Sequence, residues 1–263
     1  MKAHRARKRF GQHFLVDPGV IDAIVSAISP QAADTLVEIG PGPGAITAPL
    51  AARCDNFHAI ELDRDLAANL RAVYAGDPGV SIHEADALSY DFSGLGKSLR
   101  IVGNLPYNIS TPLLFHLVRH RSVIADMHFM LQKEVVDRMA ATPGNKAYGR
   151  LTIVLGCYFE IDALFDVDRN AFDPPPKVTS AVVRLRPLPE NRILLESGAP
   201  LSRIVATAFS QRRKTLRNAL KTVASETELE ALGIDPGLRP ENIAIADWIA
   251  LANSIDRDPD NRD

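Results

Sequence analysis

The chain has 263 residues, of which 46% are hydrophobic and 24% charged, and its formal net charge is -2 at pH 7. This length is enough to bury a sizeable core, in one large domain or in one domain with an appendage. Two cysteines outside any Cys-x-x-Cys or Cys/His cluster argue against a disulfide framework or structural zinc, and suit a reducing compartment. No apolar run is long enough to span a bilayer, and no apolar segment follows the basic N-terminus, so we expect a soluble, cytoplasmic protein without membrane contact.

The small net charge conceals two basic clusters and one acidic segment. The first cluster is an N-terminal arm, residues 2–9, the second lies within residues 212–221, and the tail 256–263 is acidic. Local patches, rather than the total charge, determine where a polyanion docks, although solvated surface is the alternative explanation. The candidate RNA-binding side chains, one of them in a loop at 142–149, are Arg7, Lys8, Arg9, Lys146, Arg212, Arg213, Lys214 and Arg217.

The first predicted helix covers residues 16–28. Asp17 is a suitable N-cap, Pro18 suits the first helical position, and the apolar residues that follow keep helical spacing. Before it, residues 9–15 combine two aromatic rings with glycine and polar side chains directly after the basic arm. His13 in this segment is either a ligand contact or an ordinary loop histidine.

A predicted strand at 35–39 enters a turn with glycines at positions 40, 42 and 44, followed by a predicted helix at 45–52. Glycine lets the backbone approach a ligand closely, and the helix N-terminus adds partial positive charge. The Gly-x-Gly-x-Gly spacing differs from the Gly-x-Gly-x-x-Gly of dinucleotide binders. Glu61, at the end of the next predicted strand, strengthens the motif because a carboxylate there can accept hydrogen bonds from both ribose hydroxyls.

Strand and helix continue to alternate. After a predicted helix at 65–74, a third strand at 80–88 contains Asp86, which could accept a hydrogen bond from an adenine amine, and a fourth strand ends at Asn104. This alternation predicts an open, mostly parallel sheet, in which ligands bind at the carboxyl ends of the strands. Four strand ends therefore point to one crevice.

The fourth strand end carries the most specific pattern. The side-chain oxygen of Asn104 can accept a hydrogen bond from an exocyclic amine. Pro106 restricts Leu105 to an extended conformation, which turns a backbone carbonyl toward the same point, and Tyr107 offers a face on which a base can stack. The alternative is an ordinary turn with a core aromatic residue.

The second half of the chain predicts further elements of both kinds. Helices are expected at 111–120 and 133–141, and strands at 127–131, 151–159 and 180–185. The stiff, proline-rich stretch 172–178 presents Phe172, either as a wall of the base pocket or as a cap on the core. A turn-rich boundary at 186–200 precedes helical patterns at 201–222, 227–232 and 243–255, the first of which carries the second basic cluster.

Taken together, these motifs resemble the small-subunit (16S) rRNA adenine N6,N6-dimethyltransferases, the KsgA-like rRNA adenine dimethylases. The matching segments cover nearly the whole chain up to the acidic tail; they are residues 7–15, 37–44, 60–65, 86, 103–111, 127–138, 146–151, 172–185 and 208–218. The resemblance implies an α/β, class I S-adenosylmethionine-dependent methyltransferase fold, Rossmann-like, with a mostly parallel seven-stranded sheet and a small C-terminal all-α domain. Residues 1–190 would form the methyltransferase domain with its basic arm, 191–255 an rRNA-binding domain, and 256–263 a disordered tail.

The resemblance also implies the activity. The family transfers methyl groups from S-adenosylmethionine to two adjacent adenosines near the 3′ end of small-subunit rRNA, so the expected partner is this rRNA in a 30S assembly intermediate, bound by a monomer. By position, the cofactor contacts fall on His13, Leu15, Gly40, Glu61, Asp86 and Asn104, and the glycine-rich turn adds Gly42. Many relatives carry asparagine where this chain has His13. The acceptor-base residues fall on Asn104, Leu105, Pro106 and Tyr107, with Phe172 behind the base.

Three other functions remain open at this stage. The large-subunit rRNA adenine methyltransferases behind macrolide resistance share the pocket, but the segments 146–151 and 172–185 favour the small-subunit enzymes. A non-catalytic RNA-binding assembly factor would show a damaged glycine turn or pocket, and both are intact in the sequence. A nicotinamide-dependent dehydrogenase is disfavoured by the glycine spacing and by a fourth strand end suited to an amine.

Overall fold

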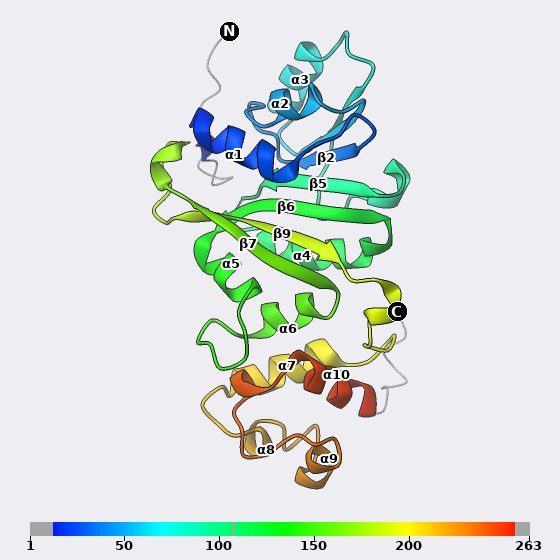
Figure 1. The fold of residues 1–263 in the computed structure, drawn as a ribbon, viewed down its shortest axis with the longest axis vertical. Helices are drawn as coiled ribbons and strands as arrows, with labels where there is room; N and C mark the ends of the chain where they lie inside the picture. Colours follow the sequence, from blue (N-terminus) through cyan, green and yellow to red (C-terminus); the bar gives the residue numbers. More distant parts are fainter. Residues whose placement is uncertain (1–12, 107, 256–263) are drawn as a thin grey trace. The chain divides into compact units, whose positions relative to one another are not determined.

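The computed structural model describes residues 13–106 and 108–255, and it divides into two compact units (Figure 1). The first unit comprises the chain up to Val136 together with Ile161–Pro187; the second comprises Asp137–Glu160 and the chain from Leu188 onward. The rRNA-binding domain expected at 191–255 falls within the second unit, which also takes in residues 137–160. The basic arm, Tyr107 and the acidic tail lie outside the described residues.

A seven-stranded sheet confirms the predicted α/β architecture. Its strand order is β4-β3-β2-β5-β6-β9-β7, with parallel pairing from β4 to β6 and antiparallel pairing of β9 with β6. The strands are β2 (Thr35–Ile39), β3 (Asn56–Glu61), β4 (Val80–Glu84), β5 (Leu99–Asn104), β6 (Ile124–Gln132), β7 (Phe159–Val167) and β9 (Ser180–Pro187). The chain reverses its strand order at β2, where β3 pairs on one side and β5 on the other, and ligands bind at such switch points.

Helices alternate with the parallel strands, as the sequence pattern predicts. They are α1 (Pro18–Ile28), α2 (Thr47–Ala51), α3 (Arg64–Val73), α4 (Ser110–Arg119) and α5 (Lys133–Met139). The cap predicted for α1 is confirmed, because the Asp17 side chain accepts a hydrogen bond from the Val20 amide at 3.0 Å. The buried face of α1, which includes Ile24 and Ile28, belongs to the same hydrophobic cluster as Val102 of β5.

A short second sheet brings the beginning of the chain to a distant loop. In it β1 (Phe14–Leu15) pairs antiparallel with β8 (Phe172–Asp173), and Leu15 lies opposite Phe172. Both of these side chains are buried. Residues 13–15 therefore lie against the proline-rich stretch. The residue pattern of either segment alone does not predict this contact.

The second unit is mainly helical and has its own core. Its helices are α6 (Arg150–Gly156), α7 (Leu201–Ser210), α8 (Leu216–Ala219), α9 (Glu226–Ala231) and α10 (Ile245–Ser254). Trp248 and Tyr148 are fully buried in this core, and the Tyr148 hydroxyl donates to the Ile243 carbonyl at 2.7 Å. The polar end of the tyrosine is thus satisfied while its ring fills the core.

Two sequence-based assignments are wrong, and the strand expected at 80–88 is shorter, because β4 ends at Glu84. Residues 151–159 were expected to form a strand, but Arg150–Gly156 is α6, and the next strand, β7, runs from Phe159 to Val167. A short run of branched apolar residues fits either a buried strand or a buried helix, and here the Thr152 hydroxyl accepts the Gly149 amide at the helix start. The helix expected over 201–222 is also interrupted, because α7 ends at Ser210 and α8 starts only at Leu216.

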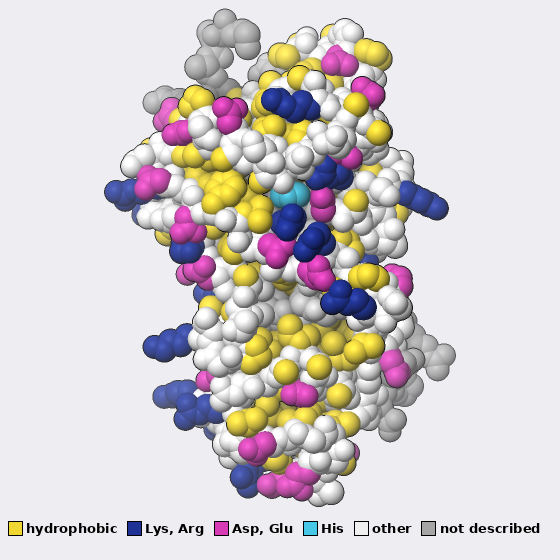
Figure 2. Space-filling model, in the orientation of Figure 1, with side chains coloured by type: hydrophobic (Ala, Val, Ile, Leu, Met, Phe, Trp, Pro, Cys, Tyr) yellow, Lys and Arg dark blue, Asp and Glu magenta, His cyan; other side chains and the backbone are white. Residues whose placement is uncertain are grey.

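Charged side chains of both signs are mixed on the face of the molecule drawn in Figure 2. Within the first unit, Arg100 forms ion pairs with Asp34 at 2.6 Å and with Asp126 at 2.9 Å, and Arg184 pairs with Asp162 at 3.0 Å. Within the described part of the chain, no helix has both the length and the apolar character needed to cross a membrane.

Gly103 of β5 lies close to the backbone of β2, and this contact yields the first prediction. A Cβ at this position would lie 2.6 Å from the Ile39 carbonyl oxygen and 3.0 Å from a methyl carbon of Leu105. The first of these neighbours is backbone of β2, so the substitution Gly103→Ala would have to displace a central strand. We expect it to lower the free energy of unfolding by about 1–3 kcal/mol, measured by urea denaturation.

Gly76→Ala is the matched control, because a Cβ at position 76 meets nothing within 4 Å. An unchanged unfolding midpoint for Gly103→Ala would contradict the close packing of β5 on β2.

Candidate active site

A cavity of about 410 Å³ lies in the first unit at the carboxyl ends of β2, β3 and β5, and its volume suits a small-molecule ligand. Ten of the eleven residues predicted for the cofactor and base sites line it: His13, Leu15, Gly40, Gly42, Glu61, Asp86, Asn104, Leu105, Pro106 and Phe172. The eleventh, Tyr107, lies outside the described residues. The strand-end pattern therefore located the cavity correctly, while the role of each residue stays a prediction.

The glycine-rich turn and the end of β3 are joined by one carboxylate. Glu61 accepts a hydrogen bond from the Gly42 amide at 3.1 Å through one oxygen and from the Asp63 amide at 2.8 Å through the other. Gly42 adopts a φ of +58°, a conformation that favours glycine, and a Cβ there would lie 3.4 Å from the Phe14 ring. Burial raises the pKa of Glu61, and these backbone donors oppose that effect.

At the end of β4, Asp86 is exposed on the cavity wall. Its carboxylate accepts a hydrogen bond from the Leu88 amide at 2.9 Å, which orients the side chain. Asp63, in contrast, is buried and caps α3 by accepting from the amides of Asp65 and Leu66. Carboxylates of two neighbouring strand ends are thus held in place by main-chain donors.

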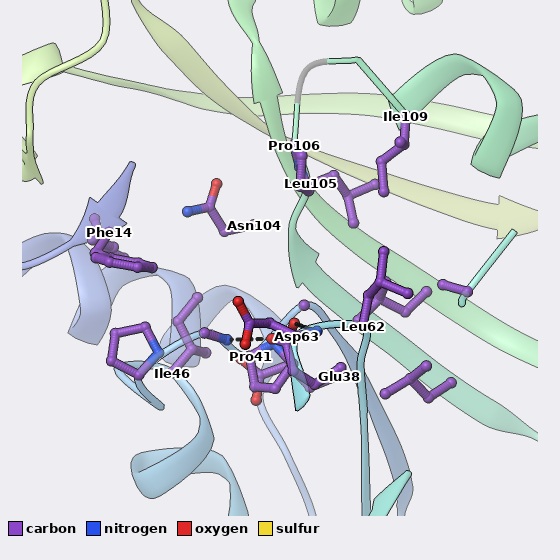
Figure 3. A pocket seen from close by; sticks show the side chains of 18 of the residues that line it. Phe14, Glu38, Pro41, Ile46, Leu62, Asp63, Asn104, Leu105, Pro106 and Ile109 are labelled. Atoms are coloured by element: carbon purple, nitrogen blue, oxygen red, sulfur yellow. Dashed lines mark hydrogen bonds between the residues drawn. The ribbon is translucent and has the colours of Figure 1, made fainter. Parts of the chain in front are cut away.

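Asn104 lies at the other side of the cavity, where its side chain projects into the space between Phe14 and Leu105 (Figure 3). Its Nδ2 donates a hydrogen bond to the His13 carbonyl at 3.3 Å. This bond fixes the orientation of the amide and leaves its Oδ1 atom to accept a hydrogen bond from a ligand. The following residue is anchored too, because the Leu105 amide donates to the Met130 carbonyl at 3.2 Å and its side chain is buried.

The segment around His13 connects three parts of the site. Its carbonyl oxygen holds Asn104, and its ring Nδ1 lies 2.7 Å from the Pro174 carbonyl, a distance at which a protonated Nδ1 donates a hydrogen bond. Two residues later, Leu15 pairs with Phe172, which lines the cavity. The segment from His13 to Leu15 therefore contacts Asn104 through the His13 carbonyl and pairs with Phe172 through Leu15.

Sequence reasoning missed several cavity residues: Phe14, Glu38, Ile46, Leu62 and Asp63. Glu38 is the most unusual of them, since it is a carboxylate in the buried central strand β2. The Thr47 hydroxyl donates to it at 2.6 Å. Burial raises the pKa of Glu38 to about 7, with a smaller contribution from the charge of Glu61 and an opposing one from Thr47. The sequence signal that could have identified Glu38 is a single acidic residue within the otherwise apolar end of the strand 35–39.

The cavity is acidic. Four of its lining residues are carboxylic acids, and its described lining contains neither lysine nor arginine; the acids are Glu38, Glu61, Asp63 and Asp86. Such a lining suits a ligand that carries positive charge together with hydroxyl and amine donors. The apolar residues around it, including Ile39 and Ile60, suit the flat faces of a nucleoside.

The predicted RNA-binding residues that the structure describes all belong to the second unit. Lys146, Arg213 and Lys214 are exposed. Arg212 lies 3.7 Å from Glu241 and stacks over the Phe209 ring at 5.9 Å, and Arg217 pairs with Glu226 at 3.1 Å. The basic cluster is therefore divided between the turn after α7, with Arg212, Arg213 and Lys214, and α8, with Arg217, rather than lying on one continuous helix. Arg7, Lys8 and Arg9 lie outside the described residues.

Comparison with known proteins identifies the family. The model of the ribosomal RNA adenine dimethylases matches residues 3–257. The chain belongs to this family. It is 56% identical over 255 residues to the ribosomal RNA small subunit methyltransferase A of Dechloromonas aromatica. The match covers 97% of this chain and 100% of that protein.

Solved structures agree with this membership. A dimethyladenosine transferase from Plasmodium falciparum is similar at a TM-score of 0.78 and 29% identity, covering 91% of this chain and 96% of that one. The 23S rRNA methyltransferase ErmE is similar at a TM-score of 0.73 and 27% identity, and the match covers 92% of this chain and 99% of that one. The expected family, the class I methyltransferase fold and the assignment as an enzyme are therefore confirmed.

The titration of Glu38 provides a prediction about stability. Because the pKa of Glu38 is raised from 4.5 to about 7, the folded protein without cofactor binds more protons than the unfolded chain between these values. Its stability contribution from this residue is present at low pH and is lost as the pH rises to about 7. Relative to Glu38→Gln, the wild-type protein should therefore be less stable at pH 8 than at pH 5, in urea denaturation at both values.

Glu84→Gln is the control, since Glu84 is an exposed carboxylate on β4 paired with Arg71. A stability difference between wild type and Glu38→Gln that stays constant with pH would show that Glu38 ionises normally.

Proposed function

We propose that this chain transfers methyl groups from S-adenosylmethionine to the N6 amines of two adjacent adenosines near the 3′ end of small-subunit rRNA, giving N6,N6-dimethyladenosines during assembly of the small ribosomal subunit. Membership of the rRNA adenine dimethylase family establishes the methyltransferase class. The observation that carries the proposal is Asn104, whose Oδ1 is oriented as an acceptor at an acidic cavity by the bond from Nδ2 to the His13 carbonyl.

The cavity fits S-adenosylmethionine in its charges and its shape. When bound, this cofactor supplies an electrophilic methyl group on a positively charged sulfur. Glu61 would accept the ribose hydroxyls, and Asp86 would accept the adenine amine, while the glycine turn at Gly40 and Gly42 lets the backbone approach. His13, Leu15 and Asn104 would complete the contacts from the opposite side. The four lining carboxylates support this assignment because they favour a cationic ligand.

In the proposed mechanism, Asn104 and the Leu105 carbonyl align the acceptor amine. The amine of adenine is a poor nucleophile because its lone pair is delocalised into the ring. If both N–H groups donate to these two oxygens, a pyramidal nitrogen is favoured and its lone pair faces the methyl group. The second transfer starts from a nitrogen with one N–H, so the pocket must accommodate a methyl group and hold the base with one hydrogen bond fewer.

The walls of the base pocket would be apolar. Phe172 is almost completely buried and lines the cavity with Pro106, so these two residues can contact the faces of a base that has left its stack. Tyr107, which lies outside the described residues, stays a predicted stacking partner. The proton leaves after the nitrogen is methylated, when it has become acidic, so the proposed mechanism needs no strong general base.

We infer the finer partners from the same family. The RNA would be presented within a 30S assembly intermediate, and the enzyme would act as a cytoplasmic monomer. The basic arm and the exposed cluster of Lys146, Arg213 and Lys214 would contact RNA phosphates. Residues 191–255 would form the rRNA-binding domain, together with the segment 137–160 that packs in the same unit.

A large-subunit rRNA substrate is the main alternative, since ErmE is a structural neighbour. The identity to ErmE is 27%, whereas the identity to the small subunit methyltransferase of Dechloromonas aromatica is 56%, which favours the small subunit. A non-catalytic assembly factor is disfavoured because the glycine turn and Asn104 are both present at the cavity.

Product mapping tests this proposal directly. Small and large subunits lacking adenine methylation would be incubated with enzyme and cofactor, and the methylated adenosines located by mass spectrometry. We expect two adjacent N6,N6-dimethyladenosines near the 3′ end of small-subunit rRNA, and a rate reduced by about a hundredfold or more for Asn104→Ala. Methylation confined to the large subunit, or full activity of Asn104→Ala, would contradict the proposal.

The basic cluster should control the salt dependence of RNA binding. Each phosphate contact that is lost lowers the slope of log K against log salt by about 0.7–0.9. Replacing Arg213 and Lys214 by glutamine should therefore reduce the magnitude of the slope by up to about 1.8, measured by titration at several salt concentrations. Lys97→Gln, an exposed lysine of the first unit, is the control. Identical slopes for wild type and the double variant would remove this cluster from the interface.

A further inference from the structure

Glu38 has no role in the contacts proposed so far, although it lines the cofactor cavity. It is 2% exposed, and within the described residues its one hydrogen-bond donor is the Thr47 hydroxyl, at 2.6 Å. A buried carboxylate with one neutral donor is poorly stabilised in its charged form. Since it lies in a central strand, its exposure is limited to the cavity that it lines.

Among the described residues, the groups around Glu38 add negative charge; no lysine or arginine lines the cavity, and His13 is its one imidazole. Glu61 of β3 repels its charge, and Tyr74, at the end of α3, is close enough that Glu38 raises its pKa. Asp63 and Asp86 line the same cavity, whose described lining contains neither lysine nor arginine. Glu38 therefore has no lysine or arginine as a counter-ion among the cavity residues that the structure describes, and the raised pKa of about 7 agrees with this geometry.

The reaction itself changes the charge inside this cavity. S-Adenosylmethionine carries a sulfonium in addition to its amino and carboxyl groups, and S-adenosylhomocysteine, the product, keeps those two groups but has a neutral sulfur. Transfer breaks the bond between sulfur and the methyl carbon, and the electron pair of that bond remains on sulfur. A positive charge in a poorly solvated cavity favours an ionised carboxylate nearby, and the loss of that charge favours protonation.

We propose that Glu38 is a charge-sensing specificity residue, which loses a proton to solvent when S-adenosylmethionine binds and takes one up when S-adenosylhomocysteine remains. This inference rests on the proposed cofactor site. Its consequence is that the cavity discriminates the substrate cofactor from the product more strongly as the pH rises through neutrality. Discrimination by charge helps an enzyme that must exchange its cofactor for each methyl group it transfers.

Linkage gives the size of the effect. With a pKa of about 7 in the free protein, the fraction of Glu38 that must lose a proton falls from about 0.9 at pH 6 to about 0.1 at pH 8. The affinity for S-adenosylmethionine should then increase about tenfold between these values. The sulfonium also lowers the pKa of the amino group of S-adenosylmethionine itself. The contribution of Glu38 is therefore isolated by comparing the ratio of the two dissociation constants in the wild type with the same ratio in Glu38→Gln, because the ligands titrate identically in both measurements.

The test is isothermal titration calorimetry of the full chain with each ligand at pH 6, 7 and 8. At pH 7, repeating the titration in phosphate and in Tris gives the number of protons released. For the wild type we expect the ratio of Kd for S-adenosylhomocysteine to Kd for S-adenosylmethionine to rise about tenfold from pH 6 to pH 8, with release of about half a proton per S-adenosylmethionine at pH 7. Glu38→Gln should abolish both effects, and Glu84→Gln should retain them.

Thr47→Val provides a second variant in case Glu38→Gln fails to fold. Without the hydroxyl donor, the pKa of Glu38 should rise, and the pH at which discrimination appears should move upward. A ratio that does not change with pH, or one that changes equally in Glu38→Gln, would overturn the proposal and assign any proton linkage to another acid such as Glu61. Absence of S-adenosylmethionine binding by the wild type would instead contradict the proposed cofactor site.

Discussion

The two hydrogen bonds that Glu61 accepts organise the site. One comes from Gly42 in the turn after β2 and the other from Asp63 after β3, so a single carboxylate connects two neighbouring strand ends. The bonds require parallel strands in register, and Ile39 indeed lies opposite Ile60. They also keep an acid ionisable despite its burial. An acidic cavity with a preorganised backbone follows from this arrangement, and the proposed cofactor chemistry depends on it.

Much of the fold was predictable because local patterns and tertiary structure agree. The strand at 35–39, the Asp17 cap and the polar strand ends all appear where the sequence places them. The strand predicted at 151–159 was wrong because the apolar residues of this segment show no periodicity that distinguishes a buried helix from a buried strand. The end of α7 at Ser210 was not predicted, because the charged residues continue past this position and mark no helix boundary in the sequence.

The site was predictable to the level of the cavity but not of its contacts. Polar residues at consecutive strand ends located Glu61, Asp86 and Asn104 together, since parallel topology alone brings such ends to one edge. The pairing of Leu15 with Phe172 and the bond from Asn104 to the His13 carbonyl join segments far apart in the chain. Such contacts depend on packing and leave no local pattern.

The central claim is that the Oδ1 of Asn104 and the Leu105 carbonyl hold the acceptor amine toward the cofactor. A crystal structure with the non-transferring analogue sinefungin and adenosine bound together tests it most directly. The account predicts that the adenosine N6 lies about 2.9 Å from both oxygens, with the base against Phe172. An adenine bound elsewhere in the cavity, with the Asn104 side chain turned away from it, would contradict the account.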